Sequence, residues 1–189
     1  GFAGVFADVA SYYFDAYGDQ TDALARIAAK NHANGVHNPY AQLRKDIGVE
    51  FCNAVSDKNP VVAGPLKRTD CSPVSDGAAA IVLSNADIAH GASQKVKFLA
   101  RSHVTDFMPM TKRNPLIFEG VIKAWESVLS DANITLDALS FAEVHDCFTI
   151  AELMIYESMG LTPLGEGARA INEGWVMKEG RLPINPSGG

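Results

Sequence analysis

In its central and C-terminal parts, the sequence alternates between short apolar runs of strand character and longer segments of helical periodicity. Three runs are short enough for buried strands: Asp76–Ser84 (DGAAAIVLS), Val96–Val104 and Leu139–Val144. Residues 115–130 and 149–159 instead carry apolar side chains every three to four positions, which predicts amphipathic helices. Strands that alternate with helices indicate an α/β fold with mixed layers.

The first part of the chain is predicted to be mainly helical. Residues 2–17 and 22–35 have apolar positions at helical spacing, and Gly18 follows the first segment as a C-cap. Residues 49–55 and 85–90 predict two shorter helices. The turn-rich segment 57–75 predicts a long ordered loop, and such loops in compact domains are often functional.

Composition restricts the classes of function. The 189 residues are 47% hydrophobic and 20% charged, which is ordinary for a globular domain or a large piece of one. The net charge of −6 and the lack of a basic cluster argue against a nucleic-acid partner. No apolar stretch approaches the ~20 residues that a membrane span needs.

Cysteine usage and the N-terminal segment bear on the compartment. Cys52, Cys71 and Cys147 are odd in number and lack CxxC spacing, which favours a reducing interior over a disulfide framework. The apolar N-terminal segment contains Asp8 and Asp15 and has no basic leader, so we do not expect a signal peptide. An intracellular location is expected, cytoplasmic or, in a eukaryote, peroxisomal.

The stretch Phe141–Tyr156 (FAEVHDCFTIAELMIY) places three reactive side chains where an apolar run meets a helical pattern. Open α/β sheets bind ligands where strands end and helices begin, and a helix N-terminus favours anionic groups. His145 could donate to a carbonyl oxygen or hold a water. Asp146 could cap the helix or orient the imidazole. Cys147 could form a thiolate, because a helix N-terminus lowers a thiol pKa.

The His-Asp-Cys corner (His145, Asp146 and Cys147, where the predicted strand meets the predicted helix) also has a purely structural interpretation. Asp146 or Thr149 would cap the helix, Cys147 would pack as a small apolar residue, and His145 would be a satisfied polar group at a strand end. A metal site is not expected, because adjacent residues on a strand point to opposite faces and no His/Cys cluster completes four ligands.

Five stretches taken together favour a site. They are YYFDAYG, AAKNHANGVHNPYAQLRK, DCSPVSDGAAAIVLS, EVHDCFTIAELMIYESMGL and INPSGG. In this order they resemble thiolases of the sterol-carrier-protein-2 type and the related acetyl-CoA acetyltransferases of bacteria and archaea. The resemblance runs along essentially the whole chain, and SDGAAA and HDCF are its most specific motifs.

The resemblance implies a layered αβαβα fold, incomplete here, in which two similar halves each hold a mixed sheet between helices. On that pattern residues 1–70 would be part of a helical loop domain that covers the coenzyme A site. Residues 71–92 would end the first half, and residues 93–189 would form a second half that stops before a GHP motif.

The implied chemistry is thiolysis of 3-ketoacyl-CoA or condensation of acetyl-CoA units, with a coenzyme A thioester as substrate and no further cofactor. In the family a nucleophilic Cys lies upstream of the matching region, and the GHP histidine and a second Cys follow it. The resemblance therefore implies a thiolase, and it leaves the activity of residues 1–189 alone open.

The resemblance also assigns residue roles. His145 stands where other thiolases have the Asn of a NEAF motif, and it would hold the thioester oxygen, directly or through a water. Asp146 would support it, Cys147 would be a packed neighbour and not the nucleophile, and Phe148 would be a wall near the acyl group. Ser72 would contact pantetheine or else be a turn hydroxyl. Gly188 and Gly189 would form a tight turn beside the pocket or else a flexible end.

Other functions remain open at this point. A thiolase-like retro-aldolase, which works with an OB-fold partner and relies on tyrosines, is one alternative, although HDCF has His145 where a Tyr would support it. A non-catalytic fragment that binds acyl-CoA is another. The family usually forms homodimers, so a second copy is an expected partner.

Overall fold

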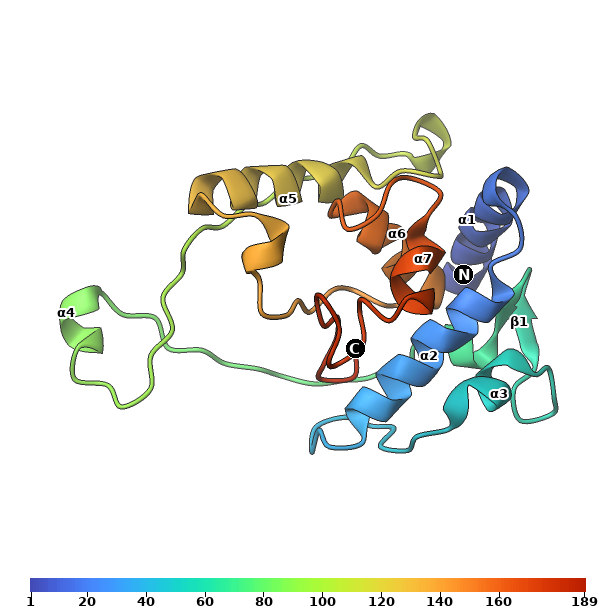
Figure 1. Ribbon diagram of the computed structural model, residues 1–189, viewed down its shortest axis with the longest axis horizontal. Coiled ribbons are helices and arrows are strands. Elements are labelled where there is room, and N and C mark those ends of the chain that lie inside the picture. The colour runs from blue at the N-terminus through green and yellow to red at the C-terminus, as the bar shows by residue number, and fades with distance from the viewer.

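The computed structural model describes residues 1–189, apart from the side chain of Met110. Helices α1 to α7 are joined by three short 3-10 turns and one small sheet (Figure 1). The elements are α1 (Phe2–Tyr17), α2 (Thr21–Gly35), α3 (Gly48–Asn53), β1 (Val61–Ala63), β2 (Leu66–Lys67), η1 (Arg68–Asp70), α4 (Ala86–Ala89), η2 (Met110–Lys112), α5 (Glu119–Ala132), η3 (Leu136–Ala138), α6 (Thr149–Ser158) and α7 (Gly167–Asn172). The predicted helices are confirmed, with ends shifted by a few residues. None of the described helices is long and apolar enough to cross a membrane.

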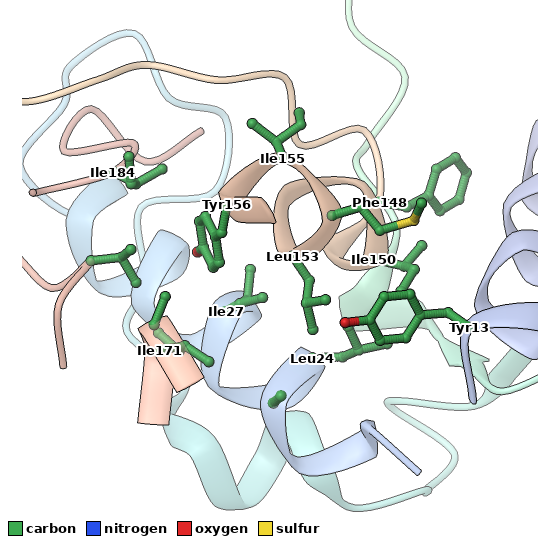
Figure 2. Packing of buried hydrophobic residues seen from close by; sticks show 14 of the residues in the cluster. Tyr13, Leu24, Ile27, Phe148, Ile150, Leu153, Ile155, Tyr156, Ile171 and Ile184 are labelled. Atoms are coloured by element: carbon green, nitrogen blue, oxygen red, sulfur yellow. The ribbon is translucent and has the colours of Figure 1, made fainter. Parts of the chain in front are cut away.

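Helix α6 is the centre of the core. All ten of its residues are buried, as expected for a helix that is apolar on nearly every side. Leu24 and Ile27 of α2 and Tyr13 of α1 pack around Ile150 and Leu153 of α6 (Figure 2). The α2 helix also contacts α3 and α7. This packing fixes the first half of α6 against the N-terminal half of α2.

The small sheet is an antiparallel hairpin of β1 and β2. Its turn contains Gly64 with φ +49°, and a Cβ at this glycine would lie 3.0 Å from the Cβ of Ala7. Glycine is therefore required both by the left-handed backbone and by the close approach of α1. The hairpin leads directly into η1 and the segment that contains Ser72.

The predictions of strands at Asp76–Ser84 and Val96–Val104 are wrong. Both segments are extended and exposed within an arm that leaves the helical body and carries α4 (Figure 1). The side chain of Val82 is 97% exposed and that of Val96 likewise 97%. A strand needs a neighbour for its N–H and C=O groups, and the described residues supply none to either segment. Their composition has strand propensity, but propensity alone makes no sheet.

The prediction of a strand at Leu139–Val144 is also wrong, although part of this segment pairs with the C-terminal residues. Ala142 forms a single parallel bridge with Ile184. Its N–H donates to the Pro183 carbonyl at 2.9 Å, and its own carbonyl accepts from the Asn185 N–H at 2.8 Å. This bridge brings residues 184–189 beside the His-Asp-Cys corner.

Candidate functional site

A cleft of about 650 Å³ lies where the start of α6, the C-terminal half of α2 and the last residues of the chain meet. Asn31 and His32 of α2, Asp70 to Ser72, Asp146 and the Gly188-Gly189 turn lie along its wall, together with the loop Asn38 to Leu43. This volume is within the range of small-molecule sites. The wall combines apolar side chains with amide, hydroxyl and carboxyl groups.

The corner is tied to the Ser72 segment by backbone contacts. Cys71 and Phe148 form an antiparallel bridge, and the Ser72 N–H donates to the Cys147 carbonyl at 3.0 Å. Thr149 donates from its hydroxyl to Asp70 at 3.0 Å. The prediction that Asp146 or Thr149 caps α6 is wrong, because Phe148 is the N-cap residue and both polar side chains have partners outside the helix.

Four of the predicted site residues line the cleft, and three others do not. Ser72, Asp146, Gly188 and Gly189 all line the cleft. His145 is exposed, Cys147 is half-buried and Phe148 is buried, and these three lie outside the described lining. The Phe148 ring stacks on Phe6 of α1 with centroids 4.6 Å apart, so it anchors the corner to the core.

The Gly188-Gly189 turn approaches both sides of the cleft closely. Gly188 has φ +110°, and a Cβ there would lie 2.6 Å from the Cα of Gly35 at the end of α2. Gly189 has φ +78°, and its Cβ would lie 2.0 Å from the Asp146 Oδ2 atom. Only glycine fits such contacts and such backbone angles.

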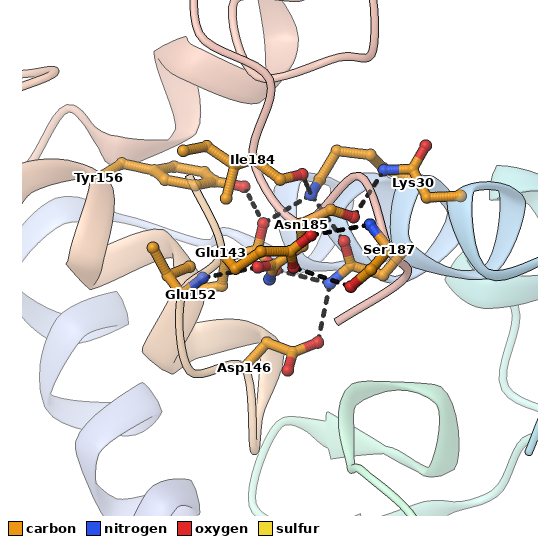
Figure 3. A network of polar contacts seen from close by, with 11 residues as sticks. Lys30, Glu143, Asp146, Glu152, Tyr156, Ile184, Asn185 and Ser187 are labelled. Atoms are coloured by element: carbon orange, nitrogen blue, oxygen red, sulfur yellow. Dashed lines mark hydrogen bonds and ion pairs between the residues drawn. The ribbon is translucent and has the colours of Figure 1, made fainter. Parts of the chain in front are cut away.

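Behind the cleft is a buried polar network that the sequence analysis missed (Figure 3). The Lys30 ammonium lies 2.7 Å from Glu152 Oε1, and both side chains are about 1% exposed or less. Lys30 also donates to the Ile184 carbonyl at 2.8 Å and to Asn31 Oδ1 at 2.6 Å. Asn185 donates to Glu152 Oε2 at 3.1 Å and accepts from the Val144 N–H at 2.7 Å.

A signal for this network was present in the sequence. Glu152 and Glu157 lie within an otherwise apolar helix, and a buried carboxylate requires a partner. Glu157 accepts from the Tyr13 hydroxyl and, at 2.7 Å, from the Gly167 N–H. The signal reveals that partners exist but not which residues they are, because those residues are distant in sequence.

Burial raises the pKa values of two side chains in the corner, Asp146 and Cys147. It raises the pKa of the Asp146 carboxyl, and the negative charge of Glu152 raises that pKa further, whereas Lys30 and His145 oppose the rise. Burial also raises the pKa of the Cys147 thiol. The thiol therefore keeps its proton more firmly than a free cysteine does, and the structure shows no activation of it.

The part of the chain that the structure describes contains no group of three or more His, Cys, Asp or Glu side chains placed to hold a metal ion. Chemically, the cleft can accept a polar ligand near a helix N-terminus, with the Ser72 hydroxyl and the Asp146 carboxyl along its wall.

Comparison with known proteins identifies the family. Residues 102–189 match the family model described as "Thiolase C-terminal domain-like". The chain is 32% identical over 190 residues to the acetyl-CoA acetyltransferase of Methanothermobacter thermautotrophicus and 31% identical over 192 residues to human sterol carrier protein 2. It is also 30% identical over 188 residues to a benzoylsuccinyl-CoA thiolase subunit of Thauera aromatica. Residues 102–189 therefore form a thiolase C-terminal-like domain, and the chain is similar along its length to thiolase-superfamily proteins, as its motifs indicated.

The matches cover nearly all of this chain but only part of each relative. The chain spans 49% of the acetyl-CoA acetyltransferase, 34% of human sterol carrier protein 2 and 48% of the benzoylsuccinyl-CoA thiolase subunit. Among solved structures, the aldolase named Ltp2-ChsH2(DUF35) superposes with a TM-score of 0.89 over 98% of this chain and 49% of that one, at 21% identity. This likeness confirms an incomplete thiolase-like α/β fold.

Proposed function

We propose that this chain forms part of an acyltransferase of thiolase type, which thiolyses 3-ketoacyl-CoA or condenses acetyl-CoA units. One observation carries the proposal: Ser72, Asp146 and Gly188, far apart in sequence, line one cleft at the start of α6. The relatives named acetyl-CoA acetyltransferase and benzoylsuccinyl-CoA thiolase support the same chemistry.

The proposed reaction needs a site that stabilises negative charge on a thioester oxygen. When a thiolate attacks C3 of a 3-ketoacyl-CoA, the acyl group passes to that sulfur, the C2–C3 bond breaks, and its electron pair moves into an enolate whose charge is on the thioester oxygen. Condensation forms the same enolate by removal of a proton from acetyl-CoA. Hydrogen-bond donors and a helix N-terminus aimed at the oxygen lower the barrier in both directions.

We assign the residues as follows. His145 holds the thioester oxygen from the exposed side of the corner, and Ser72 contacts the pantetheine chain. Gly188 and Gly189 let the backbone approach the ligand, and Phe148 holds the corner in place through its stack on Phe6. The nucleophile is not Cys147, in agreement with the raised pKa of its thiol.

The larger arrangement is part of the proposal. Residues 1–70 are assigned to the loop domain that covers coenzyme A, residues 71–92 to the end of the first half and residues 93–189 to the second half. The protein is proposed to work as a homodimer in an intracellular compartment of lipid metabolism, the cytoplasm or the peroxisome.

The test is a thiolysis assay on the protein that carries this chain, with acetoacetyl-CoA and free coenzyme A as substrates and acetyl-CoA as the measured product. Turnover that depends on His145 is the expected result. Binding of acyl-CoA without thiolysis or condensation would refute the proposal and favour a non-catalytic acyl-CoA-binding protein.

A retro-aldolase is the second candidate, and the same assay series can address it. The aldolase with the similar fold is only 21% identical, so it supports the architecture and not the reaction. A 3-hydroxyacyl-CoA is the diagnostic substrate, because its cleavage releases a ketone or aldehyde without consuming coenzyme A. Cleavage of this substrate, with acetoacetyl-CoA left intact, would favour the aldolase.

A further inference from the structure

Asp146 is the one residue of the HDCF motif that lies along the described wall of the cleft. Its Oδ2 atom accepts a hydrogen bond from the Asn31 side-chain amide at 2.9 Å. Among the described residues, no side chain donates to Oδ1. The Asn31 amide therefore holds Oδ2, and no described side chain competes with a ligand for Oδ1.

The orientation of the Asn31 amide is set by three contacts. Its Oδ1 accepts from the Lys30 ammonium at 2.6 Å, and its Nδ2 donates to Glu152 Oε2 at 2.6 Å as well as to Asp146. An amide nitrogen has two hydrogens, so each one serves a different carboxyl group. Asn31 thus links Asp146 to the buried Lys30–Glu152 pair.

The charges around Asp146 leave it without a cation of its own. From α2, Lys30 and His32 lie on this side, but Lys30 contacts Glu152 directly at 2.7 Å. From α6, Glu152 and Tyr156 face the corner, and the Tyr156 hydroxyl donates to Glu152. Across the cleft are the acidic residues Asp70 and Asp76, and His145 is the neighbour in sequence. Asp70 is paired with Lys67 at 3.2 Å, so the carboxylate that acts on Asp146 is chiefly Glu152, and burial together with this charge raises the pKa of Asp146.

We propose that Asp146 in its protonated form donates a hydrogen bond, from its free oxygen, to the carbonyl oxygen of an acyl-coenzyme A bound in the cleft. The inference rests on the proposed function for the ligand and goes beyond it by assigning this contact to Asp146 in addition to His145. An ionised carboxylate would repel a carbonyl oxygen that gains negative charge, whereas a neutral acid stabilises it. Asp146 would then be a substrate-contacting residue and Glu152 a positioning residue.

Two coenzyme A analogues test this contact directly in the protein that carries this chain. S-(2-oxopropyl)-CoA has a carbonyl that cannot be transferred, and S-propyl-CoA is the matched analogue without the oxygen. Calorimetry at a series of pH values gives the ratio of their affinities, in which pH effects on coenzyme A itself cancel. We expect the preference for the carbonyl analogue to fall by up to about tenfold as the pH rises through the Asp146 pKa.

Variants at the same position separate protonation from structure. In Asp146→Asn the amide still donates, so the preference is expected to persist and to become independent of pH. In Asp146→Leu the donor is lost, and the preference is expected to be low at every pH.

Carboxyl ¹³C NMR of the aspartates, with the Asp146 signal assigned by its loss in Asp146→Asn, supplies a readout that needs no ligand. Glu152→Gln is expected to lower the Asp146 pKa, because Lys30 then acts on Asp146 alone.

The outcomes are distinguishable. If neither analogue binds, the proposed function fails and the inference fails with it. If both bind with a ratio that does not change with pH in the unsubstituted protein, or that rises with pH, the inference alone is overturned. If Glu152→Gln does not fold, the comparison of Asp146→Asn with Asp146→Leu still decides the question.

Discussion

The ammonium group of Lys30 and the carboxylate of Glu152 lie 2.7 Å apart inside the protein, one on α2 and the other on the central helix α6. Ten helix positions of α6 are buried, so this ion pair has little access to water. Its two members depend on each other, because removing one leaves an uncompensated charge.

The first prediction concerns that dependence. Lys30→Met is expected to lower the free energy of unfolding by about 3–5 kcal/mol, measured by urea denaturation. The control is Arg26→Met, which breaks the exposed Arg26–Asp22 pair on the same helix and is expected to cost about 1 kcal/mol or less. Equal losses in the two variants would contradict the burial argument. The double variant Lys30→Met/Glu152→Leu is expected to recover much of the loss.

The second prediction uses the glycine turn. Gly160→Ala and Gly188→Ala both place an alanine at positive φ, but only Gly188 has neighbouring atoms within reach of a new Cβ. Gly160→Ala is expected to cost about 1–2 kcal/mol from backbone strain alone. Gly188→Ala is expected to cost more and to weaken acyl-CoA binding, because the Cβ meets backbone atoms of Gly35. Thermal unfolding and calorimetry measure the two effects, and similar behaviour of the variants would argue against the close packing.

The third prediction addresses catalysis. His145→Ala is expected to reduce the condensation rate by about 10²–10³-fold, the usual cost of losing one donor to an oxyanion. The matched control is His103→Ala, which removes an exposed histidine on the arm far from the motif in sequence. Steady-state kinetics should show the loss in kcat. Unchanged turnover in His145→Ala would remove this residue from the mechanism.

The fourth prediction follows from the raised pKa of Asp146. The folded protein binds the Asp146 proton more tightly than the unfolded chain does, so this group contributes its full stability below the ordinary carboxyl pKa. The contribution is lost as the pH rises through the raised pKa. Asp146→Asn cannot ionise, and its stability relative to the unsubstituted protein is therefore expected to increase from acidic to neutral pH. Denaturation at several pH values measures the difference, and a constant difference would contradict the assigned shift.

The helices were predictable because their information is local. Residues 2–17 show an apolar periodicity that ends at a glycine, and α1 spans Phe2–Tyr17 with Gly18 at its end. The same reasoning located α2 and α6 to within a residue or two. The strands were not predictable in this way, because a strand forms only where a partner segment exists. Val96–Val104 has the composition of a strand and remains unpaired in the described structure.

The site was predictable only in part. The motifs identified Ser72 and the Gly188-Gly189 turn as ligand contacts and Asp146 as a support for His145, and all of them line the cleft. The pattern could not show that Asp146 would face the cleft while His145 would be exposed, because side-chain direction at a corner depends on tertiary contacts. It also could not pair Lys30 with Glu152, since no local rule connects residues on two helices so far apart in sequence.

The bridge between Ala142 and Ile184 joins segments that are distant in sequence, which has a consequence for folding. The network joins Lys30 and Asn31 to Ile184 and Asn185, so its closure spans most of the chain. During synthesis on the ribosome, α1 and α2 can form early from local contacts, but the buried Lys30 must wait for Glu152 and then for residues 184–189. Contacts of such long sequence separation slow folding and prolong the exposure of unsatisfied groups. The corner is therefore expected to complete its contacts only after residues 184–189 have joined the network.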